Sequence, residues 1–64
     1  MQVADLIAAR IQRGELQPGA PIPSEKTLQQ DYGVARGTAR QAVRVLRDRG
    51  LVITVPQRGT YVKP

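Results

Sequence analysis

Glycines and prolines divide this sequence into short segments, and their positions limit the fold more than any other feature. Gly14, Gly33 and Gly50 each follow a stretch whose apolar residues recur at helical spacing, and glycine is a common residue just after the end of a helix. Three prolines and Gly19 lie within residues 16–23, which excludes a helix there. The chain therefore has room for three short helices and, after Gly50, for a pair of short strands.

The first helix is predicted over residues 2–13, with an apolar face made by Val3, Leu6, Ile7 and Ile11. At most a short edge strand around Ile22 is compatible with the prolines that follow.

The second helix is predicted to begin after Ser24, a favoured N-cap residue, with Glu25 in the first turn at the positive end of the helix dipole. Leu28 and Tyr32 lie four residues apart and so share its inward face. Val34 can turn its side chain inward between this helix and the next.

The third helix is predicted over about 35–49, and four residues form its core face: Ala39, Ala42, Val43 and Leu46. Residues 51–55 and 60–62 are β-rich, and the Pro-Gln-Arg-Gly turn between them predicts a β-hairpin. The expected fold class is α+β, mostly α: three helices followed by a small antiparallel hairpin, in one domain spanning residues 1–64.

The composition excludes several kinds of chemistry. A chain of 64 residues buries only a small core, so a deep catalytic pocket is not expected. It contains neither cysteine nor histidine, which removes thiol chemistry, the usual zinc ligands and the commonest general base. Its five carboxylates are scattered, with no pair spaced for acid and base work. We expect no enzyme activity, no metal and no cofactor.

The charge is distributed unevenly. The net charge is +5, but residues 1–33 carry three basic and four acidic side chains, whereas residues 34–64 carry seven basic side chains and one acidic. This segregation indicates a face that binds a polyanion. No signal peptide or apolar stretch long enough to span a membrane is visible, so the chain is interpreted as cytosolic.

The third helix carries most of this charge. At about 100° per residue, Arg36, Arg47, Arg40 and Arg44 fall within about 80° of one another, outside the core face. Arginines placed four apart repel one another by a few tenths of a kcal/mol each. A solubilising face is the simpler alternative, but a groove lined with phosphates accounts better for the repulsion.

The roles of the candidate residues are expected to differ along the helix. Arg36, Thr38 and Arg40 lie toward its N-terminus and are best placed to reach base edges in a major groove, where arginine binds guanine through two hydrogen bonds. Arg44 and Arg47 lie farther along and are expected to contact phosphate or water.

Three residues outside this helix are further candidates. Arg58 beside Gly59 in the hairpin turn suits a cation that reaches a minor groove, although glycine is also routine in such turns. Lys26 begins the second helix, where a helix N-terminus and a cation both favour phosphate, although it is equally an ordinary exposed lysine.

Four segments together resemble the winged helix-turn-helix domain of the GntR family of bacterial transcriptional regulators, and most closely its HutC-type branch. They are residues 18–28, 33–43, 49–52 and 58–62. The resemblance covers nearly the whole chain. It implies DNA contacts by Lys26, Arg36, Thr38, Arg40, Arg58 and Gly59. One departure is Ala35, where family members often have serine or threonine, so a helix cap and a phosphate contact are missing.

The resemblance also implies a mode of action. The third helix, about 35–49, enters the major groove and the wing, about 56–60, lies at the minor groove. A homodimer binds an inverted-repeat operator, as a repressor controlled by an effector that binds a C-terminal domain absent from this chain. The protein is then expected in the bacterial cytoplasm, associated with the nucleoid.

Rival functions fit the sequence less well. A winged helix can also serve as a protein-interaction or RNA-binding module. However, an RNA reader needs aromatic residues on which bases stack, and the chain has only Tyr32 and Tyr61. A membrane-surface helix needs a stronger apolar face than the alanines and valines of the third helix. With no spare apolar stripe, the isolated domain is expected to be monomeric.

Overall fold

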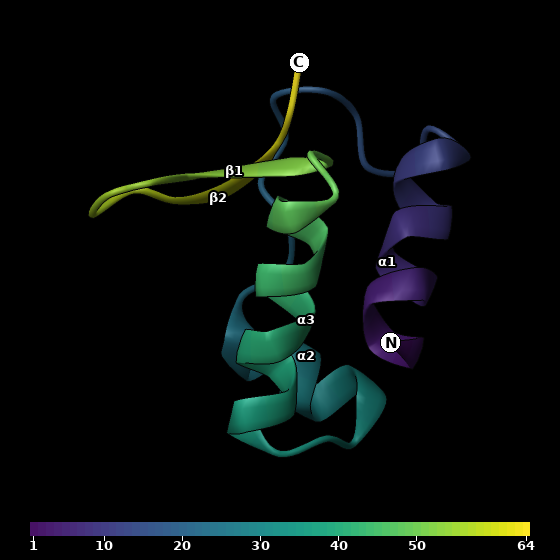
Figure 1. Ribbon diagram of the computed structural model, residues 1–64, viewed down its shortest axis with the longest axis vertical. Coiled ribbons are helices and arrows are strands. Elements are labelled where there is room, and N and C mark those ends of the chain that lie inside the picture. The colour runs from purple at the N-terminus through teal and green to yellow at the C-terminus, as the bar shows by residue number, and fades with distance from the viewer.

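The computed structural model describes all 64 residues, and it contains the three helices and the hairpin that the sequence predicts. The elements are α1 (Gln2–Gln12), α2 (Glu25–Tyr32), α3 (Arg36–Asp48), β1 (Val52–Val55) and β2 (Gly59–Val62). Helix α3 is central: α1 and α2 both pack against it, and the hairpin projects from its C-terminal end, away from α1 (Figure 1). This is the expected α+β architecture, mostly helical. None of the helices combines the length and apolar character needed to cross a membrane.

Helix α1 buries small residues as well as large ones. Val3, Ala4, Ile7 and Ala8 are buried, and the alanines let α1 lie close to the rest of the core. The prediction that Leu6 belongs to this apolar face is wrong, because 46% of Leu6 is exposed. The buried face is centred on the side of Ile7 opposite to Leu6, where the alanines rather than the leucine make the contacts.

Helix α2 begins and ends as predicted. The backbone N–H of Thr27 donates to Ser24 Oγ at 3.1 Å, so Ser24 caps the helix. Gly33 ends it in the left-handed conformation, with φ of 63°. Leu28 is fully buried and Tyr32 packs half-buried against the core, which confirms the inward face of this helix.

Helix α3 supplies the centre of the core. Ala39, Ala42 and Leu46 are completely buried, whereas Val43 is half-buried and packs at the edge of the core. The helix begins after Ala35, which makes no side-chain cap hydrogen bond. The missing cap that the sequence indicated is therefore a feature of the structure.

The hairpin pairs Val52 with Val62 at its base and Val55 with Gly59 at its tip. Its turn is closed by the N–H of Arg58, which donates to the carbonyl of Val55 at 3.0 Å. Gln57 in this turn has φ of 63°, a left-handed conformation that glycine or asparagine adopts more easily.

Strand β2 is also bound on its other side by the connection between α1 and α2. The N–H groups of Gly19 and Ile22 donate to the carbonyls of Val62 and Thr60, at 2.9 and 3.0 Å. The N–H of Val62 donates to the carbonyl of Ala20 at 2.8 Å. The edge strand predicted around Ile22 is thus present only as a single β-bridge, and β2 lies between this segment and β1.

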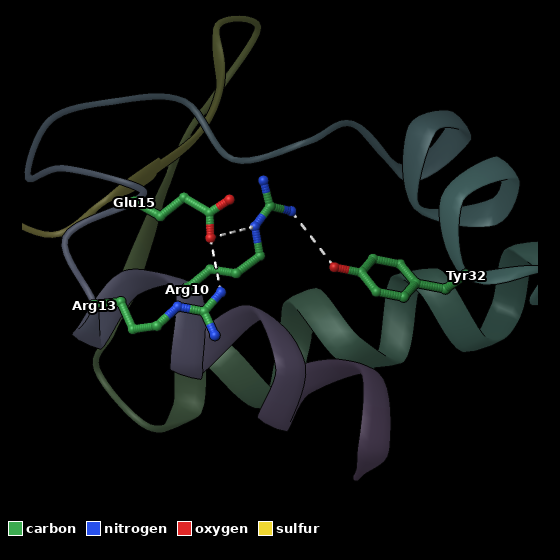
Figure 2. A network of polar contacts seen from close by, with 4 residues as sticks. All are labelled: Arg10, Arg13, Glu15 and Tyr32. Atoms are coloured by element: carbon green, nitrogen blue, oxygen red, sulfur yellow. Dashed lines mark hydrogen bonds and ion pairs between the residues drawn. The ribbon is translucent and has the colours of Figure 1, made fainter.

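A polar network connects α1 to the end of α2 (Figure 2). Arg10 Nη1 donates to the Tyr32 hydroxyl at 3.4 Å, and Arg10 Nε lies 3.5 Å from the Glu15 carboxylate. The bond to Tyr32 raises the pKa of Arg10. Glu15 also accepts from Arg13 at 2.8 Å, and this bond lowers the pKa of its carboxyl. The network links the C-terminal part of α1 to the last residue of α2.

Candidate nucleic-acid interface

The arginine stripe of α3 is exposed along its whole length. Arg36, Arg40, Arg44 and Arg47 all lie at the surface, while the opposite side of the helix is buried against α1 and α2. The helical spacing thus placed the charges correctly. Four guanidinium groups on one face of one helix make a surface suited to an extended anion.

Between this stripe and the hairpin lies a shallow hollow of about 240 Å³. It is lined by Glu25, Arg40, Val43, Arg44, Arg47, Thr54 and Thr60. The start of α2, the middle of α3 and both strands therefore meet around it. Its walls are almost entirely polar, which favours a charged, hydrated ligand over an apolar one.

One side-chain hydrogen bond joins the hairpin to α3 across this hollow. Arg47 Nη1 donates to Thr54 Oγ1 at 3.4 Å, and the hydroxyls of Thr54 and Thr60 lie 3.2 Å apart. Arg47, expected to contact only phosphate or water, therefore also contacts the wing. This bond adds a polar contact between the exposed faces of the helix and the strands.

Four candidate residues on the helices have side chains without a polar partner in the chain: Lys26, Arg36, Thr38 and Arg44. Lys26 is exposed in the first turn of α2, and Arg36 is exposed at the start of α3. Neither they nor Arg44 form an ion pair, so these cations are free to meet a ligand. Thr38 is half-buried in the first turn of α3.

Arg58 and Gly59 are at the free end of the hairpin, away from the helices (Figure 1). The structure does not bring them together with the arginines of α3. The Arg58 side chain is exposed, and its carbonyl accepts a hydrogen bond from the Tyr61 hydroxyl at 3.0 Å. Gly59 has φ of 129°, so its backbone conformation alone accounts for glycine at this position.

Glu25, Thr54 and Thr60 line the hollow but were not among the candidate residues predicted from the sequence. Glu25 was interpreted only as a favourable charge at the start of α2, but its Oε1 lies 3.5 Å from Arg40 Nε. Glu25 is the only carboxylate that lines the hollow. The angle at which α2 crosses α3 brings the two residues together, and no spacing within either helix indicates it.

The surface as a whole can bind an anion but offers no catalytic constellation. No group of three or more histidine, cysteine, aspartate or glutamate residues could hold a metal. No buried polar side-chain atom lacks a partner. What remains is a convex, cationic helix beside a projecting hairpin, a shape that can fit a groove and the backbone beside it.

Residues 1–62 match the sequence profile described as "Bacterial regulatory proteins, gntR family". The chain belongs to the gntR family. It is the winged helix-turn-helix DNA-binding domain of such a regulator, with α2 and α3 as the helix-turn-helix and the hairpin as the wing. Membership of a family of regulators confirms the prediction that this domain is not an enzyme.

Several gntR proteins are similar along nearly the whole domain. The Escherichia coli K12 mannosyl-D-glycerate transport/metabolism system repressor MngR is 47% identical over 97% of the chain, which covers 26% of MngR. The Bacillus subtilis 168 repressor NagR is 39% identical over 95% of the chain and is covered to 25%. The chain thus spans about a quarter of the length of these curated relatives.

The fold matches solved structures closely. AraR(DBD) in complex with operator ORR3 aligns with a TM-score of 0.89 and 39% identity, over 95% of this chain and 74% of that one. This likeness confirms the winged helix-turn-helix architecture that the sequence predicted.

Proposed function

We propose that this gntR domain recognises operator DNA for a bacterial repressor, with α3 in the major groove and wing residues 56–60 at the minor groove. The observation that carries the proposal is the exposed arginine stripe of α3 beside the wing. The similarity to AraR(DBD), which was solved with an operator, supports the same ligand for this chain. The contacting residues are Lys26, Arg36, Thr38, Arg40, Arg44, Arg58 and Gly59.

The proposal extends to the protein that contains this domain. We propose that it is a HutC-type regulator in the bacterial cytoplasm, associated with the nucleoid. A domain after residue 64 binds the effector and forms the homodimer that matches an inverted-repeat operator. Support comes from the repressors MngR and NagR, each about four times as long as the similar region. The isolated domain is a monomer, because the two large exposed apolar residues, Leu6 and Ile53, lie singly on different elements.

Binding to duplex DNA is tested by fluorescence anisotropy with labelled duplexes at two salt concentrations. Selection of tight binders from a random duplex library supplies the preferred half-site. Because the surface contacts are mainly cationic, affinity should fall as salt rises, with a slope of about −0.9 per phosphate contacted. Binding that is absent at low salt, or that does not respond to salt, contradicts the proposal. Tighter binding to single-stranded RNA would favour the RNA-binding alternative.

Two variants separate base reading from phosphate contact. Arg40→Ala should cost about 1 to 3 kcal/mol on the selected duplex and remove discrimination at one position per half-site. Lys26→Ala should weaken binding to all sequences alike and reduce the salt slope by about one unit. Arg13→Ala, at the C-terminal end of α1, is the control for the loss of a positive charge. If Arg40→Ala keeps full discrimination while Lys26→Ala abolishes it, α3 is not the reading helix.

A further inference from the structure

A single acidic side chain stands among the cations of the proposed DNA-binding surface. Glu25 is the first residue of α2, and it shares the hollow beside α3 with Arg40, Arg44 and Arg47. A carboxylate there weakens the attraction of the surface for phosphate. Its position therefore needs a physical reason other than general affinity for DNA.

The geometry links Glu25 to one arginine in particular. Its Oε1 lies 3.5 Å from Arg40 Nε, and the two side chains remain 41% and 60% exposed. The Arg40 side chain forms no hydrogen bond with any other group, so the pair is the only polar interaction of its guanidinium within the chain. An exposed pair of this kind is weak, so it orients the guanidinium without locking it.

A guanidinium approached on its Nε side keeps both terminal nitrogens available. Those two nitrogens can donate in parallel to O6 and N7 of guanine, which is a neutral partner. A phosphate at the same place would bring a negative charge next to the Glu25 carboxylate. Guanine carries no charge, so the Glu25 carboxylate does not repel it. Glu25 therefore makes Arg40 favour a base edge over the DNA backbone.

We propose that Glu25 is a positioning residue that determines specificity, by orienting Arg40 for a guanine edge and opposing phosphate at that site. The inference rests on the proposed function and assigns a role to a residue outside the DNA contacts named above. It places the source of discrimination partly on α2, outside the recognition helix.

The test compares Glu25→Gln with Asp31→Asn. Both changes remove one negative charge from α2 and keep the shape of the side chain, but Asp31 is exposed at the other end of the helix and forms no ion pair. Affinity is measured on the library-selected duplex and on an unrelated duplex, at two salt concentrations. Base preference at each position is measured with single-base variants of the selected duplex.

Glu25→Gln should tighten binding to the unrelated duplex about three-fold, the factor that two unit charges about 6 Å apart in water give. Glu25→Gln should tighten binding to the selected duplex less. The ratio of the affinity for the selected duplex to that for the unrelated duplex should therefore fall, and the preference for guanine at one position should weaken. The affinity of Glu25→Gln for DNA should fall more steeply with rising salt than that of the wild-type domain. Asp31→Asn should leave both the ratio and the base preferences unchanged.

A double-variant cycle shows whether the effect passes through Arg40. In an Arg40→Ala background, Glu25→Gln should no longer change the ratio or the preference at that position. An unchanged ratio for Glu25→Gln in a wild-type domain that binds specifically overturns this inference alone. So does a loss of discrimination that persists without Arg40, because Glu25 would then contact a base itself. A wild-type domain without salt-dependent duplex binding overturns the proposed function, and this inference with it.

Discussion

Replacing Ala35 by serine should supply the cap that α3 lacks. Ser24 before α2 has φ of −64° and ψ of 163°, and Ala35 before α3 has φ of −71° and ψ of 159°. The two positions thus have nearly the same backbone conformation. In each case the third residue of the helix is a threonine, and Thr27 N–H donates to Ser24 Oγ. A serine at position 35 can accept from Thr38 N–H in the same way.

The expected gain is about 1 kcal/mol, because a side-chain cap satisfies one of the first-turn N–H groups that have no partner within the helix. Ala35 is exposed, so the added hydroxyl displaces no packed atom. For a domain of this size, about 1 kcal/mol corresponds to a rise in Tm of about 4–8 °C.

Thermal unfolding followed by far-UV circular dichroism measures the change, in the absence of DNA so that a new contact to a ligand plays no part. Ser24→Ala is the matched control and should lower Tm by a similar amount, because it removes the cap that Thr27 uses. If Ala35→Ser leaves Tm unchanged while Ser24→Ala lowers it, the two helix starts are not equivalent and the reasoning from their dihedral angles fails.

Three further predictions concern the turn, the core and the ion pairs. Gln57→Gly should raise stability by up to about 1 kcal/mol in thermal unfolding, because φ is 63° there, whereas Gln57→Val should lower it. Leu46→Ala should cost about 2–5 kcal/mol and unfold much of the domain at 25 °C by circular dichroism, since Leu46 is completely buried; half-buried Val43→Ala should cost less. The bond from Arg49 at 2.8 Å holds the pKa of Asp5 below its ordinary value. The stability from this pair is therefore present above pH about 4 and lost as the pH falls through the lowered pKa. In urea unfolding between pH 2 and 6, the free energy of unfolding should fall less at acid pH for Asp5→Asn than for the wild-type domain.

The order and limits of the elements could be predicted because local rules determine them. Ser24 begins α2 through its side chain and Gly33 ends it through its backbone conformation. Both residues occupy the positions at the ends of the helix that the sequence predicts. The exposed arginine stripe follows likewise from the helical repeat, because Ala39 and Leu46 bury the other side of α3.

The contacts between elements could not be predicted, because they depend on how the helices cross. Leu6 was expected in the core, but the alanines of α1 fill the interface and leave it exposed. The approach of Glu25 to Arg40 and the bond from Arg47 to Thr54 join elements that no sequence spacing relates. The left-handed Gln57 was missed because neither glycine nor asparagine marks the position.

The pairing of β2 on both sides has a consequence for how the domain opens. Residues 19–22 are held by residues 60–62, about forty positions away, and not by their neighbours in sequence. Hydrogen exchange reports such openings as cooperative units. The amides of Gly19, Ile22 and Val62 should therefore exchange together, because the last strand holds the connection between α1 and α2 through backbone hydrogen bonds. Fraying at the C-terminus then loosens the segment that leads into α2, so residues 19–22 and the last strand behave as one region in the kinetics of unfolding.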